Sequence, residues 1–161
     1  MKTYSLKKGI LIMFVFGITV FLVIPFTCAK LDGLFRFPAT IAPVDFLLGT
    51  VLLVIGGAVA VWCIILFLTI GKGTPIPLFP PKRFIVRGPY KYTRNPMALG
   101  TWIALIGEAL ILHSLTFLFF IVFVIIPAVT LFIIKYEEPD LEKRFGGEYL
   151  EYKKKVPRWI P

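Results

Sequence analysis

Residues 115–134 read LTFLFFIVFVIIPAVTLFII, an apolar stretch without a single charged side chain. A helix needs about 20 such residues to cross the hydrocarbon core of a bilayer, which is about 30 Å thick. This stretch has that length, so it predicts a membrane-spanning helix. Three further apolar stretches, at 9–26, 44–70 and 96–112, predict the other spans of an all-α integral membrane protein with four transmembrane helices. Only His113-Ser114 separates the last two, which therefore predict an antiparallel helical hairpin.

The composition of the whole chain supports this class. Of its 161 residues, 58% are hydrophobic and only 17% are charged, and the mean hydropathy is +0.86. Soluble domains are about 45–50% apolar and about 25% charged, and a core of this size cannot hide the excess. An aromatic content of 16% also argues against a disordered chain. We therefore expect one membrane domain over residues 1–161.

The first apolar stretch has an alternative interpretation. Basic residues precede residues 9–26, as they do in a secretory signal peptide. The apolar region of a signal peptide is about 7–15 residues long, and this one is longer. We therefore expect a retained transmembrane helix.

The basic residues predict the orientation. In the four-span arrangement, 16 of the 18 Lys and Arg residues lie on one side of the membrane, and only Lys30 and Arg36 lie on the other. Cytoplasmic loops carry the excess of Lys and Arg. Both termini and the loop at 71–95 are therefore predicted to be cytoplasmic, in the cell or inner membrane.

The polar residues gather in two segments on that side. Residues 1–70 form two N-terminal spans, and residues 71–161 comprise the loop 71–95, the hairpin 96–134 and a C-terminal segment 135–161. Prolines stiffen the loop, and prolines and glycines together exclude a continuous helix. This indicates either a ligand-holding loop or an ordinary basic loop that attracts anionic lipids. In the last segment, an apolar stripe predicts an amphipathic helix on the membrane surface; its residues are Leu141, Phe145, Tyr149, Tyr152 and Val156.

Several kinds of chemistry have no support in the sequence. It contains no glycine-rich dinucleotide or Walker motif, and one histidine with two separated cysteines, Cys28 and Cys63, predicts no metal site. We expect no nucleic-acid partner, and the oligomeric state stays open. Glu108 is a charge within a span and so a functional candidate, although an interfacial structural role is the other interpretation.

Two blocks of residues, one on each side of the hairpin, form a more specific pattern. The first has G-x-Y at Gly88–Tyr90 and R-N-P-x-x-x-G at Arg94–Gly100. The second has the acids Glu137-Glu138, then F-G-x-x-Y-x-x-Y at 145–152 and V-P at 156–157. Together they resemble the membrane methyltransferases grouped around isoprenylcysteine carboxyl methyltransferase and the phospholipid N-methyltransferases. The resemblance covers residues 71–161.

This resemblance implies a methyltransferase that uses S-adenosyl-L-methionine at the cytoplasmic face. The residues it implies for cofactor binding are Lys82, Arg83, Phe84, Ile85, Tyr90, Asn95, Pro96, Met97, Ala98 and Glu137. Arg94, Asn95 and Glu138 are the implied catalytic residues. We also expect Arg94 to pair with Glu137 or Glu138, because a guanidinium can bind a carboxylate with two parallel hydrogen bonds.

The resemblance also bears on the methyl acceptor. Ile133 stands where the carboxyl methyltransferases carry an arginine associated with substrate. This favours a lipophilic acceptor such as a phospholipid amino head group or another amphiphile over a prenylcysteine carboxylate. The alternatives are an isoprenylcysteine carboxyl O-methyltransferase or a non-enzymatic small transporter or lipid-binding protein, in which Glu108 would serve transport.

Overall fold

The computed structural model describes residues 6–35, 43–75 and 79–160, and its regular elements in these ranges are all helical. The prediction of an all-α membrane protein is confirmed to this extent. Lys2 and Arg36, which enter the predicted charge asymmetry, lie outside the described residues.

Three of the described helices are long and apolar enough to cross a membrane: Lys8–Phe35, Val44–Gly71 and Leu115–Phe145. The first combines α1 (Leu6–Ile18), a π-helical turn (Thr19–Val23) and α2 (Ile24–Phe35). The second is α3 (Pro43–Leu66), which ends in a π-helical turn at Phe67–Gly71. The third joins α5 (Leu115–Phe120), α6 (Ile126–Phe132) and α7 (Glu138–Phe145) through π-helical turns at Ile121–Ile125 and Ile133–Glu137.

The remaining apolar helix, α4 (Pro96–Ile111), is shorter than the other three. Its 16 residues extend about 24 Å at 1.5 Å per residue, less than the hydrocarbon thickness of about 30 Å. The structure thus supports three full-length spans and one short apolar helix beside them.

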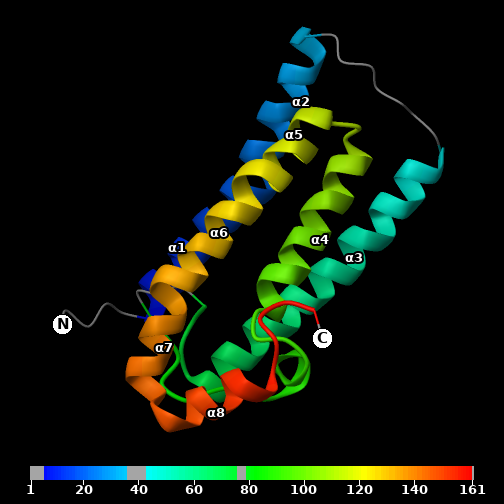
Figure 1. The fold of residues 1–161 in the computed structure, drawn as a ribbon. Coiled ribbons are helices and arrows are strands. Elements are labelled where there is room, and N and C mark those ends of the chain that lie inside the picture. The colour runs from blue at the N-terminus through cyan, green and yellow to red at the C-terminus, as the bar shows by residue number, and fades with distance from the viewer. Residues whose placement is uncertain (1–5, 36–42, 76–78, 161) are drawn as a thin grey trace.

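Helix α4 packs along α3 through facing glycines. A Cβ atom on Gly56 would lie 2.4 Å from the carbonyl oxygen of Gly100, and one on Gly49 would lie 2.7 Å from that of Gly107. These four glycines let the two backbones approach closely, as small residues do between membrane helices. The predicted hairpin therefore opens beyond its turn: α4 lies along α3, whereas α5 packs on α2 (Figure 1).

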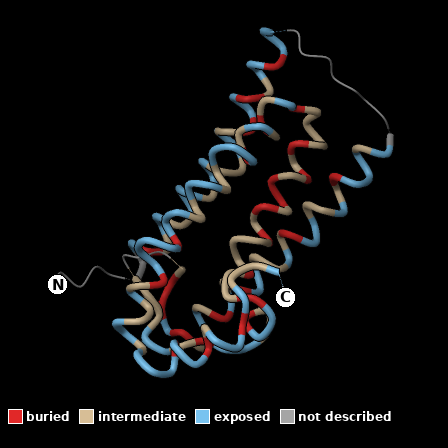
Figure 2. The backbone as a smooth tube through the Cα atoms, viewed as in Figure 1, coloured by how far each residue is buried: buried red, intermediate tan, exposed pale blue. Residues whose placement is uncertain are grey.

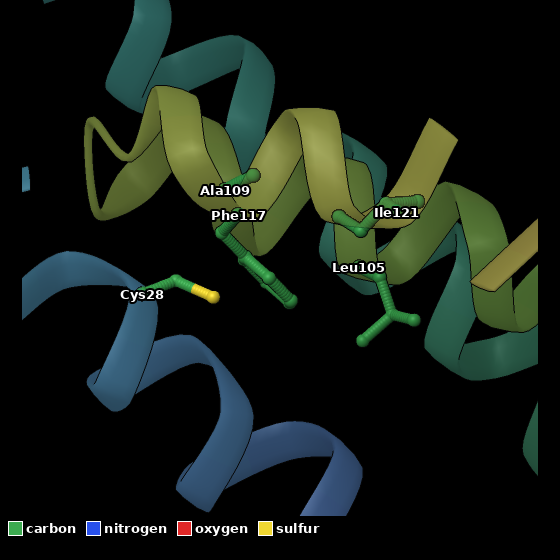
Figure 3. Close-up of a cluster of buried hydrophobic side chains, with 5 residues drawn as sticks. All are labelled: Cys28, Leu105, Ala109, Phe117 and Ile121. Atoms are coloured by element: carbon green, nitrogen blue, oxygen red, sulfur yellow. The ribbon is translucent and has the colours of Figure 1, made fainter. Parts of the chain in front are cut away.

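The far end of the bundle holds the two sides together. The carboxylate of Asp32 in α2 accepts hydrogen bonds from the Ser114 and Thr116 hydroxyls, and from the Thr116 backbone N–H at 3.0 Å. Below them Cys28, Phe117 and Ile121 form a buried cluster with Leu105 and Ala109 of α4 (Figure 3). Among the described helices α4 carries the most buried positions, as the tube in Figure 2 shows.

The structure corrects the prediction for the C-terminal segment. The expected single surface helix is two helices, α7 and α8 (Gly147–Lys155), separated at Gly146, whose φ of +51° is one that a side chain disfavours. Three residues of the predicted apolar stripe, Tyr149, Tyr152 and Val156, are buried, and Phe84 of the loop packs against them. The stripe thus forms a protein core instead of a membrane-binding surface.

Candidate functional site

The loop and the C-terminal segment meet at one end of the bundle, near the beginning of α1 (Figure 1). Three hydrogen bonds join the end of the loop to the chain after α8. The Arg94 N–H donates to Pro157 O at 2.9 Å, and the Thr93 hydroxyl and the Asn95 side-chain amide both donate to Arg158 O at 3.0 Å. These bonds are made across more than sixty residues of sequence, so they fix two distant segments against each other.

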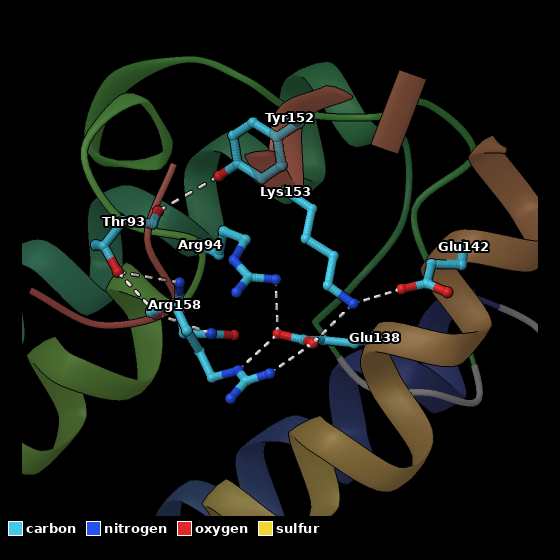
Figure 4. Close-up of polar contacts among 8 residues, drawn as sticks. Thr93, Arg94, Glu138, Glu142, Tyr152, Lys153 and Arg158 are labelled. Carbon is cyan, nitrogen blue, oxygen red and sulfur yellow. Dashed lines mark hydrogen bonds and ion pairs between the residues drawn. The ribbon is translucent and has the colours of Figure 1, made fainter. Parts of the chain in front are cut away.

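A cluster of charges lies beneath this junction, centred on Glu138 (Figure 4). Arg158 donates to both carboxylate oxygens, from Nε at 2.9 Å and from Nη2 at 3.0 Å. Arg94 Nη1 lies 2.9 Å from Glu138 Oε1, which confirms the predicted ion pair with Glu138. Lys153 lies 3.6 Å from Glu138 Oε2 and 2.6 Å from Glu142 Oε1. The expectation that Arg94 would make two parallel hydrogen bonds to the carboxylate is wrong, because Arg158 makes them.

The charges around Glu138 keep it ionised. Burial raises the pKa of its carboxyl, but the hydrogen bond from Arg158 and the charges of Arg94, Arg158 and Lys153 outweigh burial and lower it below its usual range. Glu138 lies four residues beyond the apolar stretch 115–134, in the part of the helix that faces this cluster. Its oxygens are occupied by protein cations, so it serves to hold segments together.

Aromatic rings cover the other side of the junction. The ring of Phe84 lies 5.2 Å from that of Phe145 and 5.1 Å from that of Tyr152, centre to centre. The Tyr152 hydroxyl donates to Tyr90 O at 2.7 Å, which ties α8 to the loop. Burial and the Glu138 charge raise the pKa of Tyr149 to about 12, so this phenol stays neutral.

Tyr90 and Glu137 lie close enough for the charge of Glu137 to act on the Tyr90 phenol. Tyr90 is buried, and burial first, then Cys63 and Glu137, raise its pKa well above the usual value. Glu137 is exposed, and it makes no hydrogen bond or ion pair with any described residue. Its pKa is raised by desolvation from the protein around it, then by the carboxylates of Glu138 and Asp140. A free carboxylate beside a neutral phenol is suited to a cationic ligand.

The guanidinium of Arg94 offers the opposite charge. Its Nε is buried and has no hydrogen-bond partner in the described part of the chain, and the contact of Nη1 with Glu138 lacks hydrogen-bond geometry. Buried donors of this kind seldom stay unpaired, so Arg94 has capacity for an anionic group of a ligand. The site thus combines one available carboxylate with one partly available guanidinium.

The other residues singled out by the resemblance lie around this junction in different roles. The backbone N–H groups of Lys82 and Arg83 donate to Gly71 O, and the two side chains are exposed. Ile85 is buried with Tyr90, and Met97 packs against the same cluster. Asn95 precedes α4, and Pro96 and Ala98 belong to its first turn. The segment 82–85 is irregular in structure, not a strand.

Four members of the charge and hydrogen-bond network were not predicted: Thr93, Glu142, Lys153 and Arg158. Lys153 and Arg158 belong to a basic C-terminal stretch that resembles any solvated tail, so composition does not separate them from Lys154 or Lys155. The V-P pair at 156–157 was the available signal, because it turns the chain back so that Arg158 reaches Glu138.

The candidate Glu108 and the single histidine lie elsewhere. Glu108 has a carboxylate oxygen, Oε2, that is buried without a partner among the described residues, and it lies within α4. His113 occupies the turn between α4 and α5 with a φ of +49°. In the described ranges no group of three or more His, Cys, Asp or Glu residues could hold a metal ion.

Comparison with known proteins identifies one family. The family described as phospholipid methyltransferase matches this chain over residues 44–148, from the beginning of α3 into α8. No curated protein and no solved structure matches the chain significantly. The matched region contains the loop, α4, Glu137 and Glu138, and it leaves out α1, α2 and Arg158.

Proposed function

The chain belongs to the phospholipid methyltransferase family, and from that premise we propose that it transfers a methyl group from S-adenosyl-L-methionine to a lipophilic acceptor. The acceptor class that we propose is a phospholipid whose head group ends in an amine. The observation that carries the proposal is the unpartnered carboxylate of Glu137 beside Tyr90, where the loop meets the C-terminal segment.

The residues present fit this cofactor, which carries an ammonium, a sulfonium and a carboxylate. Glu137 is a free anion for a cationic group, and the buried Nε of Arg94 is a free donor for the carboxylate. Tyr90 would line the cofactor with an aromatic ring, and Met97 and Ala98 would line it from the first turn of α4. When bound, the cofactor supplies a methyl group on positively charged sulfur for in-line displacement, in which the carbon–sulfur bonding electrons stay on sulfur.

This chain would act mainly by positioning. We propose that Arg94, Asn95 and Glu138 hold the loop and the C-terminal segment in register, since each is engaged across that junction. Correct alignment of donor and acceptor can supply several kcal/mol of a reaction barrier (roughly 7–11 at best). The buried aromatic rings would exclude water from the site.

The bilayer setting follows from the same proposal. We propose that α4 is a fourth, short span, that both termini are cytoplasmic, and that the site faces the cytoplasm. The clustering of Lys and Arg at the end of the bundle that carries the site supports this orientation. The same basic surface would attract anionic lipids.

Calorimetric binding of S-adenosyl-L-methionine to the purified protein in detergent tests the proposal. We expect the natural sequence to bind. Glu137→Gln should bind with an affinity at least about tenfold lower, because a charge-assisted hydrogen bond is worth about 1.5–3 kcal/mol. Glu148→Gln, which changes an exposed acid on α8, should bind normally. Equal affinity of all three proteins would remove Glu137 from the site, and absence of binding by any would refute the proposed cofactor.

A further inference from the structure

An apolar groove runs along the bundle between its first helix and α3. Its volume is about 440 Å³. One wall consists of residues from Met13 to Leu22, among them Gly17 and Phe21, and Ile64 of α3 lines the opposite side. Every residue that lines the groove is apolar or glycine.

The groove begins close to the proposed site. Gly9, one helical turn before Met13, lies against the loop, since a Cβ atom there would be 2.6 Å from the ring of Phe79. On the opposite wall, Cys63 precedes Ile64 and belongs to the buried cluster that contains Tyr90 and Ile85. The lining of the groove therefore lies within one helical turn of residues that contact the loop or the cluster around Tyr90.

The shape and chemistry of the groove suit an extended hydrocarbon chain. The ten residues from Met13 to Leu22 extend about 14 Å along the helix. No polar side chain lines the groove, so a polar head group would lose its hydrogen bonds there. A hydrocarbon chain has no hydrogen bonds to lose. Gly17 keeps part of the space open, because nothing lies within 4 Å of the position its Cβ would take.

We propose that this groove holds an acyl chain of the lipid acceptor while its amino head group reaches the cofactor that Tyr90 and Glu137 would hold. The inference rests on the proposed function and names the part of the lipid that the protein recognises. The wall from Met13 to Leu22 precedes residues 44–148, so this chain supplies it from outside the part that matches the family.

Photo-crosslinking tests the groove without relying on catalysis. The protein is reconstituted with trace phosphatidylethanolamine that carries a diazirine on one acyl chain, and labelled peptides are identified by mass spectrometry. We expect labelling concentrated at residues 13–22 and near Ile64, and a loss of about tenfold in Gly17→Trp, whose side chain would fill the groove. Gly33→Trp is the matched control, because Gly33 is also unobstructed but lies in α2. Labelling spread evenly over lipid-exposed residues such as Phe119 and Phe123 would show ordinary surrounding lipid and overturn the proposal.

Steady-state kinetics separates this inference from the proposed function. For Gly17→Trp we expect the KM for dioleoyl-phosphatidylethanolamine to rise about tenfold or more, since losing burial of roughly two methylene groups has that effect. The KM for the dihexanoyl analogue and the kcat should stay unchanged. An unchanged KM for the long-chain lipid would refute the acyl-chain site in an active enzyme. Groove labelling without any methyl transfer would support the site and refute the proposed function.

Discussion

Replacing Glu138 by Gln removes the anion that three cations share. Its partners differ in burial: the Arg158 and Lys153 side chains are 31% and 36% exposed, whereas that of Arg94 is only 10% exposed. Ion pairs with the exposed partners contribute about 0–1 kcal/mol each. Leaving the Arg94 cation buried without its partner costs about 3–5 kcal/mol, so that term decides the outcome.

We therefore expect Glu138→Gln to lower the free energy of unfolding by about 3–5 kcal/mol. At roughly 2–4 °C per kcal/mol for a chain of this size, the midpoint of thermal unfolding should fall by about 6–20 °C. Circular dichroism of the protein in detergent measures it. Glu142→Gln provides the matched control, because Glu142 pairs with Lys153 where both side chains are 36% exposed, and it should change stability by less than about 1 kcal/mol. Equal midpoints for Glu138→Gln and the natural sequence would show that the cluster does not hold the junction together.

Three further predictions concern packing, hydrogen bonding and acid stability. Gly56→Ala should destabilise the protein by about 1–3 kcal/mol in the same assay, because the new Cβ meets the α4 backbone, whereas Gly57→Ala should not, since its Cβ meets nothing within 4 Å. Tyr152→Phe should cost about 1–3 kcal/mol in denaturant unfolding, because its hydroxyl bonds Tyr90 O, and Tyr136→Phe, at an exposed ring, should be neutral. The pKa of Glu138 is lower in the folded protein than its ordinary value of 4.5, so its contribution is complete above about pH 4.5 and is lost as the pH falls through the folded value. A pH series of unfolding midpoints should show this acid loss in the natural sequence and a smaller loss in Glu138→Gln.

The long helices were predictable because hydropathy alone defines them. The apolar stretches at 44–70 and 115–134 correspond to the helices Val44–Gly71 and Leu115–Phe145, the second of which continues well beyond its apolar part. The helix continues without a break beyond the apolar stretch, and this extension, which hydropathy does not predict, brings Glu138 to the junction. Hydropathy does not distinguish the glycines of α3, of which Gly49 and Gly56 face α4 and Gly57 does not.

Helix pairing was harder to predict from the sequence. A short turn at His113-Ser114 predicts that α4 and α5 run beside each other, yet α4 packs on α3. The reason is the matched spacing of Gly49 and Gly56 with Gly107 and Gly100 on the antiparallel partner, which permits a closer approach than the bulky side chains of α5 would. A pair of glycine spacings becomes informative only when the two helices are known to be neighbours.

The candidate site was predicted in outline. The pairing of Arg94 with Glu138 is confirmed, whereas the roles of the implied cofactor and catalytic residues stay predictions. The stripe from Leu141 to Val156 has the period of a surface helix, and periodicity cannot distinguish a face that meets lipid from one that meets Phe84 of the loop. The left-handed backbone at Gly146, which splits the segment in two, decides between them.

An assay of methyl transfer tests the proposed function most directly. Purified protein in liposomes of phosphatidylethanolamine would be incubated with methyl-labelled S-adenosyl-L-methionine, and the labelled product identified by mass spectrometry of the extracted lipid. We expect label on the head-group nitrogen, at a rate strongly reduced by Glu137→Gln and unchanged by Glu148→Gln. Absence of labelled lipid, or label transferred equally well by Glu137→Gln, would contradict this expectation.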